Sequence, residues 1–307
     1  MAILLTVCLF TGVISLSAQA NESLSLSSCD YISYDLEDRT MTYHSYDELP
    51  DREITYLPSY FPNGAEPIAP PVSPNAVIGT DSRTRVNPTN VGPYCNTVYL
   101  KSTFSTGATI TATGFMLGPS AVITAGHCVY NDEHEGLATS VLIIPAKNGT
   151  LEPYGRTTAS KIVVNPDYMA NTSTENDWAI VELNDDLGTQ TGWLGLQANG
   201  AYINAFVYNT GYPTPETAEA QNDSQTYMLL GTGYVMNIYP DTFRGTWDAS
   251  VCNSGGPVFL YDYSRGYTAI GILTGGGNDG PMYDSDTYTL ATTITSDMLS
   301  LFLEYRS

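Results

Sequence analysis

The stretch that most constrains this chain is the turn Cys252–Val258, in which Ser254 is followed by two glycines and the chain runs on into an apolar strand. A serine hydroxyl is a poor nucleophile until a neighbouring base accepts its proton and backbone N–H groups stabilise the oxyanion. Glycine beside the serine lets a substrate carbonyl approach the backbone and allows turn angles that a side chain would forbid. The stretch therefore predicts a nucleophile at Ser254 and requires a histidine base and a carboxylate elsewhere.

One of the three histidines has a setting that suits such a base. His127 lies in Thr124–Cys128, directly after the apolar run Ala121–Ile123. A carboxylate to orient its imidazole is predicted at Asp177, which opens a strand of alternating apolar residues. The chain order His127, Asp177, Ser254 is that of the chymotrypsin fold, and it differs from the orders in subtilisin and in the α/β-hydrolases.

Four motifs carry a resemblance to a known family. They are VIGTDSRTRV from Val77, TAGHCVY around His127, NDWAIVEL around Asp177 and NSGGPVF around Ser254. With these motifs the chain resembles the trypsin-like serine peptidases, and more closely the bacterial glutamyl endopeptidases, over residues 76–305. The resemblance implies a serine endopeptidase that hydrolyses polypeptides through a His-Asp-Ser triad and an acyl-enzyme, with no metal or organic cofactor.

From Asn96 onward the pattern is all-β, with short apolar and β-branched runs separated by Gly, Pro, Asn and Asp. The predicted strands are Thr97–Phe104, Ala108–Leu117, Ala121–Thr124, Val141–Pro145, Lys161–Val164, Trp178–Leu183, Ala205–Tyr208, Tyr227–Gly231, Val258–Tyr261, Ala269–Thr274 and Thr289–Thr293. Their count suits two six-stranded antiparallel β-barrels, residues 76–190 with His127 and Asp177 and residues 191–307 with Ser254. A short C-terminal helix, Ser296–Tyr305, is predicted to begin with an N-cap serine and to pack on a barrel.

The first 75 residues are interpreted as segments that precede the enzyme. Residues 1–20 are an apolar run ending in Ala-Gln-Ala, which is typical of a secretory signal peptide and of an extracellular protein, although a basic start is missing. A membrane span is the alternative, but the run is short for one. Residues 21–75 are acidic and aromatic, then proline-rich, with no sustained period, and are interpreted as a propeptide and linker. The resemblance at Val77 favours a zymogen cleaved after Asn75; a disordered spacer that is never removed is the alternative.

The chain is strongly acidic, with 11 basic and 32 acidic residues and a formal net charge of −21. This charge argues against binding of nucleic acid and against attraction to an anionic membrane. It suits a solvated surface that keeps a secreted protein soluble. The resemblance implies polypeptide substrates as partners; we further expect a monomer, and no stable membrane association.

The resemblance also implies an oxyanion hole formed by the backbone N–H groups of Ser254 and Cys252. The family normally has glycine two residues before the serine, where this chain has Cys252. A side chain there makes the needed peptide orientation costly, since a positive φ is uncommon for a residue with a Cβ. Loss of one oxyanion donor typically costs about 10²–10³ in rate, so a weaker protease is compatible with a complete triad.

Primary specificity stays open between acidic, basic and apolar residues. In glutamyl endopeptidases a histidine on the strand that lines the primary pocket binds the substrate carboxylate, and Leu273 occupies the matching position here. Asp248 lies six residues before Ser254, the spacing at which trypsins carry the aspartate that binds arginine or lysine. The resemblance further implies that the edge Thr274, Gly275 and Gly276 pairs with the extended substrate backbone.

Two further departures bear on activation and on disulfides. Trypsins bury their new amino terminus against an aspartate directly before the serine, but this chain has Asn253, so that switch is absent. Cys95, Cys128 and Cys252 follow the predicted cleavage site, an odd number for an oxidising compartment. The resemblance implies that a cysteine after the histidine often forms a disulfide, and a Cys95–Cys128 bond is as readily expected as free thiols. The alternative function is a catalytically silent double barrel that binds peptides or surfaces.

Overall fold

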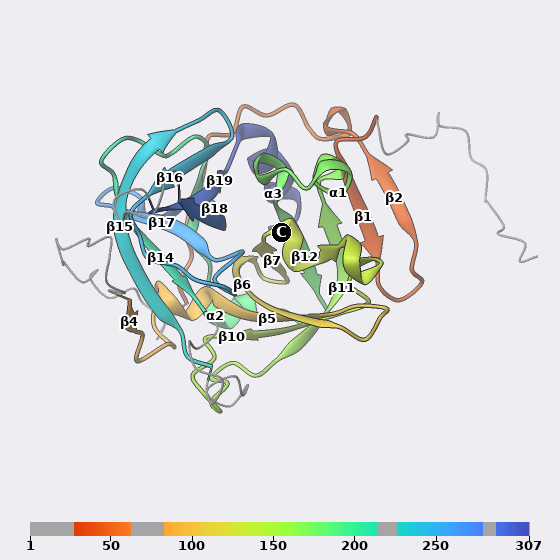
Figure 1. Ribbon diagram of the computed structural model, residues 1–307, viewed down its shortest axis with the longest axis horizontal. Helices are drawn as coiled ribbons and strands as arrows, with labels where there is room; N and C mark the ends of the chain where they lie inside the picture. The colour runs from red at the N-terminus through yellow and green to blue at the C-terminus, as the bar shows by residue number, and fades with distance from the viewer. Residues whose placement is uncertain (1–27, 63–82, 214–225, 279–286, 307) are drawn as a thin grey trace, which may run out of the picture.

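The computed structural model describes residues 28–62, 83–213, 226–278 and 287–306. The predicted signal peptide, the cleavage site after Asn75 and the segment from Val77 to Asp81 lie outside these ranges. β-Strand is the main secondary structure of the described chain, and the strands are arranged around two cores (Figure 1).

The first barrel has six strands, as predicted. They are β5 (Thr97–Thr103), β6 (Thr109–Gly118), β7 (Ala121–Thr124), β10 (Ser140–Pro145), β11 (Thr157–Val164) and β12 (Ala179–Leu183). The antiparallel order β10-β5-β6-β7-β12-β11 is closed by pairing of β10 with β11. Closure leaves no free edge within these six strands except where β11 runs on beyond β10.

The second barrel also has six strands, although the sequence predicted only five of them. They are β14 (Phe206–Gly211), β15 (Leu229–Ile238), β16 (Thr242–Gly245), β17 (Pro257–Asp262), β18 (Gly266–Asn278) and β19 (Thr287–Thr293). The order β17-β14-β15-β16-β19-β18 closes through β17 and β18. The short strand β16, which was missed, pairs with β15 and β19 and buries Phe243 in the barrel core.

Short elements connect and extend the barrels. They are β4 (Thr84–Arg85), β8 (Tyr130–Asn131), β9 (Gly136–Leu137), β13 (Gly195–Gln197), α1 (Pro166–Asn171), α2 (Gly188–Thr191) and the 3₁₀ turns η2 (Tyr94–Asn96), η3 (Gly126–Cys128), η4 (Asp132–His134) and η5 (Thr174–Asn176). The C-terminal helix α3 (Ser296–Glu304) is confirmed, but its N-cap is Thr295 and not the predicted serine. Thr295 has extended backbone angles and its side chain accepts a hydrogen bond from the Met298 N–H, so the helix begins one residue later than its cap.

Residues 28–62 have regular structure where the sequence showed no period. They form β1 (Tyr31–Asp35), β2 (Met41–His44), η1 (Tyr46–Glu48) and β3 (Tyr56–Leu57). In Figure 1 this segment is orange; it extends the first barrel at β1 and β2, runs along the upper edge of the molecule, and reaches the second barrel. Strand β1 pairs with β11, and β3 pairs with β13.

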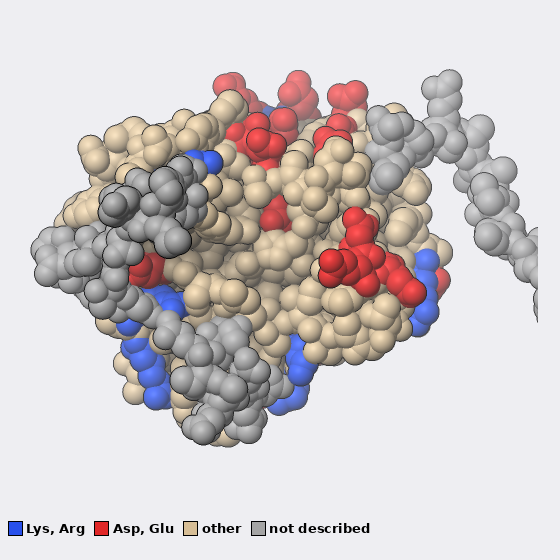
Figure 2. Space-filling model, in the orientation of Figure 1, with Lys and Arg blue, Asp and Glu red and all other residues tan. Residues whose placement is uncertain are grey.

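The surface carries the acidity of the sequence. Figure 2 shows Asp and Glu side chains gathered along the upper edge of this face and on its right-hand part, with Lys and Arg mainly below. Among the described residues, no helix is both long enough and apolar enough to cross a bilayer.

Candidate active site

His127 and Asp177 are brought together by neighbouring strands of the first barrel. His127 lies in η3, just after β7, and Asp177 lies just before β12; these strands pair with Thr124 opposite Ala179. The Asp177 carboxylate accepts two hydrogen bonds from His127, at 2.7 Å from ring Nδ1 and at 2.9 Å from the backbone N–H. This pairing fixes both the position and the orientation of the imidazole.

The surroundings of Asp177 explain why its carboxylate lies so close to His127. Asp177 is only 3% exposed. A Cβ on Gly126 would lie 2.9 Å from the Tyr168 ring and 3.2 Å from Asp177 Oδ1, so glycine makes room for the carboxylate. Burial, and then the charge of Asp177, raises the pKa of Tyr168, which keeps that phenol neutral beside the carboxylate. Tyr168 is a supporting residue that no sequence motif singled out.

The histidine is held in a partly open position. Its side chain is 32% exposed, whereas that of Asp177 is 4% exposed. Burial lowers the pKa of His127, but the Cys128 sulfur and the Asp177 carboxylate raise it, and the raising contributions prevail, so that the pKa lies well above its ordinary value. A histidine with a raised pKa, in its neutral form, accepts a proton more readily than an ordinary histidine does.

The loop that carries Ser254 is anchored on strand β6 of the first barrel. The Thr113 N–H donates to Ser254 O at 2.9 Å, and the Thr113 hydroxyl donates to Cys252 O at 2.8 Å. Gly255 has φ 84°, and a Cβ there would lie 2.1 Å from Thr113 O. The first barrel therefore helps to position Ser254, which belongs to the second barrel.

Asn253 occupies the position where trypsins have a charged aspartate, and it is satisfied without a cation. It is 1% exposed. Its amide donates to Asn209 Oδ1 at 3.2 Å and accepts from the Ser250 N–H at 3.4 Å. A neutral side chain with these partners needs no buried amino terminus to compensate it. Asn209 had no signal in the sequence.

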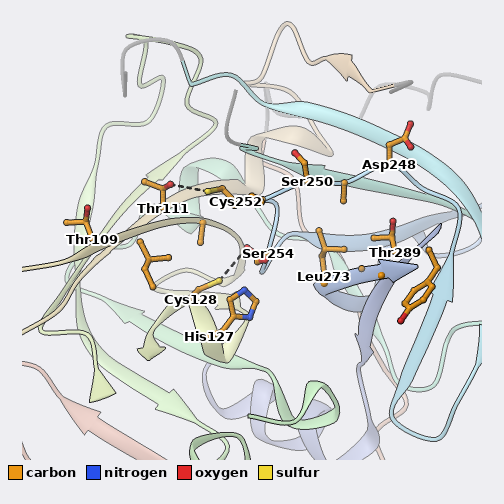
Figure 3. Close-up of a pocket in the computed structure, with 18 residues that line it drawn as sticks. Thr109, Thr111, His127, Cys128, Asp248, Ser250, Cys252, Ser254, Leu273 and Thr289 are labelled. Carbon is orange, nitrogen blue, oxygen red and sulfur yellow. Dashed lines mark hydrogen bonds between the residues drawn. The ribbon is translucent and has the colours of Figure 1, made fainter. Parts of the chain in front are cut away.

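Cys252 has the backbone conformation that the sequence analysis identified as costly. Its φ is 73°, in the left-handed region that favours glycine. Its sulfur lies 3.2 Å from the Thr111 hydroxyl, on strand β6 (Figure 3). The chain therefore adopts the glycine-like turn despite the side chain.

A cavity of about 890 Å³ contains His127 and Ser254 among its lining residues (Figure 3). Four residues of the expected substrate-binding set, Asp248, Leu273, Gly275 and Gly276, also line it, and so does Cys252. Figure 3 places Asp248 on the far side of the cavity from His127.

Two of the residues that were predicted to bind substrate, Thr274 and Leu273, expose little of their side chains. Thr274 does not line the cavity; it is 8% exposed, and its hydroxyl accepts from Thr292 at 3.5 Å. Leu273 is 2% exposed and belongs to the apolar core of the second barrel.

Among the described residues, the four cysteines Cys29, Cys95, Cys128 and Cys252 form no disulfide bond. The Cys95–Cys128 disulfide is not formed, because the two sulfurs face different partners. Cys95 Sγ donates to Thr191 O at 3.0 Å, whereas Cys128 Sγ donates to Ser254 O at 3.6 Å. Within the described residues, no three His, Cys, Asp or Glu side chains are grouped so that they could hold a metal ion.

Solved structures support the fold independently of sequence. A Glu endopeptidase in complex with MPD superposes with a TM-score of 0.62 at 22% identity, over 75% of this chain and 98% of that chain. The protease Anisep from Arthrobacter nicotinovorans superposes with a TM-score of 0.57 at 20% identity, over 73% of this chain and 99% of that chain. At these identities the likeness concerns the fold.

Sequence relatives give the family. An extracellular metalloprotease of Bacillus subtilis is 30% identical over 232 residues, covering 75% of this chain and 69% of the relative. A glutamyl endopeptidase of Bacillus licheniformis is 28% identical over 246 residues, covering 78% and 72%. The family model described as Trypsin matches residues 82–296. The chain therefore belongs to the trypsin family and is a chymotrypsin-fold serine endopeptidase.

Proposed function

We propose that the chain hydrolyses peptide bonds through a triad of Ser254, His127 and Asp177. Ser254 attacks the carbonyl carbon, His127 takes the serine proton and later gives it to the leaving amine, and Asp177 holds the imidazole tautomer. The 2.7 Å bond between His127 Nδ1 and Asp177 carries the proposal, because it turns the opposite ring nitrogen into the base of a cavity that Ser254 also lines.

The oxyanion would be stabilised by the backbone N–H groups of Ser254 and Cys252. Their neighbours are committed elsewhere: the Asn253 N–H donates to Ser250 O at 3.0 Å, and the Gly255 N–H donates to Leu273 O at 2.7 Å. The left-handed turn at Cys252 supports this assignment, because it gives the loop the conformation that glycine usually provides.

The chain is further proposed to be secreted and made as a zymogen that is cleaved after Asn75. The apolar first 20 residues and the extracellular name of the Bacillus subtilis relative support secretion. Amino-terminal sequencing of secreted, active protein is expected to begin at Ala76 or Val77. Active protein that begins at Asn21 would contradict the zymogen.

A peptide panel that varies only the residue before the cleaved bond tests the activity. It contains Glu, Asp, Arg, Lys, Phe and Leu at that position, and it is run with secreted protein and with the Ser254→Ala variant. Cleavage of at least one peptide by the wild type, and of none by the variant, is expected. Silence of correctly processed wild type across the panel would contradict the proposal and favour a peptide-binding double barrel.

The substrate residue that is preferred before the cleaved bond then indicates which side chains of the cavity bind it. Cleavage after Glu would require a group other than Leu273 to bind the carboxylate, because an apolar side chain has no donor. Cleavage after Arg or Lys would indicate that Asp248 binds the positively charged substrate side chain, and this cleavage would be lost in Asp248→Ser. Cleavage after Phe or Leu would indicate that the apolar wall of the cavity, which includes Leu273, binds the substrate side chain.

A further inference from the structure

We propose that residues 28–62 stay bound to the two barrels after the chain is cleaved, so that the mature enzyme consists of two noncovalently associated chains. The proposal rests on the proposed cleavage after Asn75, since an uncut chain holds the segment covalently. The segment has two separate anchors, one on each barrel.

The first anchor is strand addition. β1 runs antiparallel to β11, with Ile32 opposite Val164 and Asp35 opposite Lys161. This part of β11 extends past β10, which pairs with β11 only at Thr157 and Thr158. Loss of β1 would leave the N–H and C=O groups of that edge without strand partners.

Side chains of the same hairpin enter the interior. Ile32 is fully buried, Tyr31 is 5% exposed, and both belong to the main apolar core together with residues of the first barrel. The Tyr31 ring stacks on His44 with centroids 4.6 Å apart, which ties β1 to β2. Departure of the segment would therefore open the main core to water, and this cost opposes dissociation.

The second anchor lies on the second barrel. β3 pairs with β13, with Leu57 opposite Leu196, and Leu57 is 5% exposed. Tyr60 and Trp193 exchange two backbone hydrogen bonds, at 3.0 and 2.8 Å, and their rings lie 4.7 Å apart.

The catalytic chain has a surface shaped for this segment. A Cβ on Gly192 would lie 2.1 Å from Tyr60 O, so the segment is seated where only glycine fits. The Arg306 guanidinium donates to Pro58 O at 2.6 Å and to Leu194 O at 2.8 Å, which joins the segment, the second barrel and the end of the chain.

A retained segment would not block the candidate active site. None of the described residues that line the cavity belongs to residues 28–62. Two anchors on one short chain also reinforce each other, because release of one leaves the other to hold it at an effective concentration of about millimolar.

The test uses the full chain with Ser254→Ala and a recognition sequence for a sequence-specific protease inserted after Asn75. After cleavage by that protease, the sample is passed through a size-exclusion column in native buffer, and the main peak is analysed by denaturing mass spectrometry. The expected result is equimolar leader fragment and barrel fragment in one peak. They should separate on a non-reducing denaturing gel, because Cys29 forms no disulfide bond with the described barrel residues. A folded barrel peak without the leader fragment would overturn the proposal.

Paired variants of the hairpin sharpen the test. Ile32→Asp places a charge in the core and is expected to release the leader fragment after cleavage. Met41→Asp changes a residue of β2 that is 44% exposed and should leave the fragment bound. If Ile32→Asp does not fold, urea titration of the cleaved parent protein decides: release of the fragment together with unfolding of the barrels supports the proposal, and release before unfolding contradicts it. Because every arm is catalytically disabled, failure here is distinct from failure of the proposed activity.

Discussion

The first barrel holds His127 and Asp177 through two direct hydrogen bonds, whereas the second barrel presents Ser254 on a loop that depends on contacts with the other barrel. This pair, His127 and Asp177, is called the dyad below; it is held between the neighbouring strands β7 and β12. The loop is fixed by Thr113 and by left-handed angles at Cys252 and Gly255. The proposed base is thus positioned within one barrel, and the proposed nucleophile is positioned by the interface between the two barrels. Changes to the dyad should alter catalysis alone, while changes to the loop should alter stability as well.

The largest effect is expected for Asp177→Asn. An amide cannot hold the imidazole in the same tautomer, so kcat should fall by about 10⁴-fold while the melting temperature changes little. The measurement is the steady-state hydrolysis of the best panel peptide. Asp186→Asn, at an exposed position of the same region, is the matched control. A loss below tenfold would remove Asp177 from the triad.

Gly255→Ala should act on the loop through stability. The added Cβ would lie 2.1 Å from Thr113 O and 2.2 Å from Thr124 Oγ1, at φ 84°. Strain and overpacking together should lower the free energy of unfolding by about 3 kcal/mol, as measured by urea unfolding. Gly107→Ala has nearly the same angle, φ 82°, but open space around its Cβ, and should cost about 1 kcal/mol. Equal losses in the two variants would show that the barrel contact does not hold the loop.

The pH dependence of kcat/KM should report the protonation of His127 beside Asp177. Because the pKa of His127 is raised, its imidazole is protonated, and unable to take the serine proton, up to a higher pH than an ordinary histidine. The kcat/KM of an uncharged peptide should therefore fall below a midpoint that lies above pH 6.5, by about tenfold per pH unit. In Asp177→Asn the midpoint of the residual activity should move to lower pH. A midpoint below 6 in the wild type would contradict the raised pKa.

The smallest effect is expected for Cys252→Gly. Glycine relieves the positive φ but gains freedom in the unfolded chain, so the net stabilisation should be about 0.5–1 kcal/mol. Cys252→Ala removes the thiol and keeps the Cβ, so it should not be stabilised. Urea unfolding of the two variants separates backbone strain from the contact with Thr111. Stabilisation of both to the same extent would assign the effect to the sulfur.

The sequence predicted the elements whose signal is local. His127, Asp177 and Ser254 lie in motifs, and the barrel strands show apolar runs between turn residues. Strand β16 was missed because its four residues, with one buried apolar side chain and a terminal glycine, are too short to show a period. The N-cap was misplaced by one residue because Thr295 and Ser296 are both good caps.

Other features depend on partners that are distant in the chain. The hairpin β1–β2 forms on the edge of β11, more than a hundred residues away, so its own pattern is weak. Thr113 looks like an ordinary strand residue until the second barrel is placed against the first, and Asn209 does so until the loop that carries Asn253 is placed against β14. The cost of Cys252 could be anticipated from its residue type, but its φ of 73° needed the structure.

The most direct test of the central claim is covalent labelling of Ser254. Correctly processed protein is treated with a peptidyl phosphonate or a sulfonyl fluoride, and the site is mapped by peptide mass spectrometry. The account predicts one label on Ser254 of the wild type, much slower labelling of Asp177→Asn, and none on Ser254→Ala. Absence of label on wild-type Ser254, or labelling that is as fast in Asp177→Asn, would contradict an activated serine in this cavity.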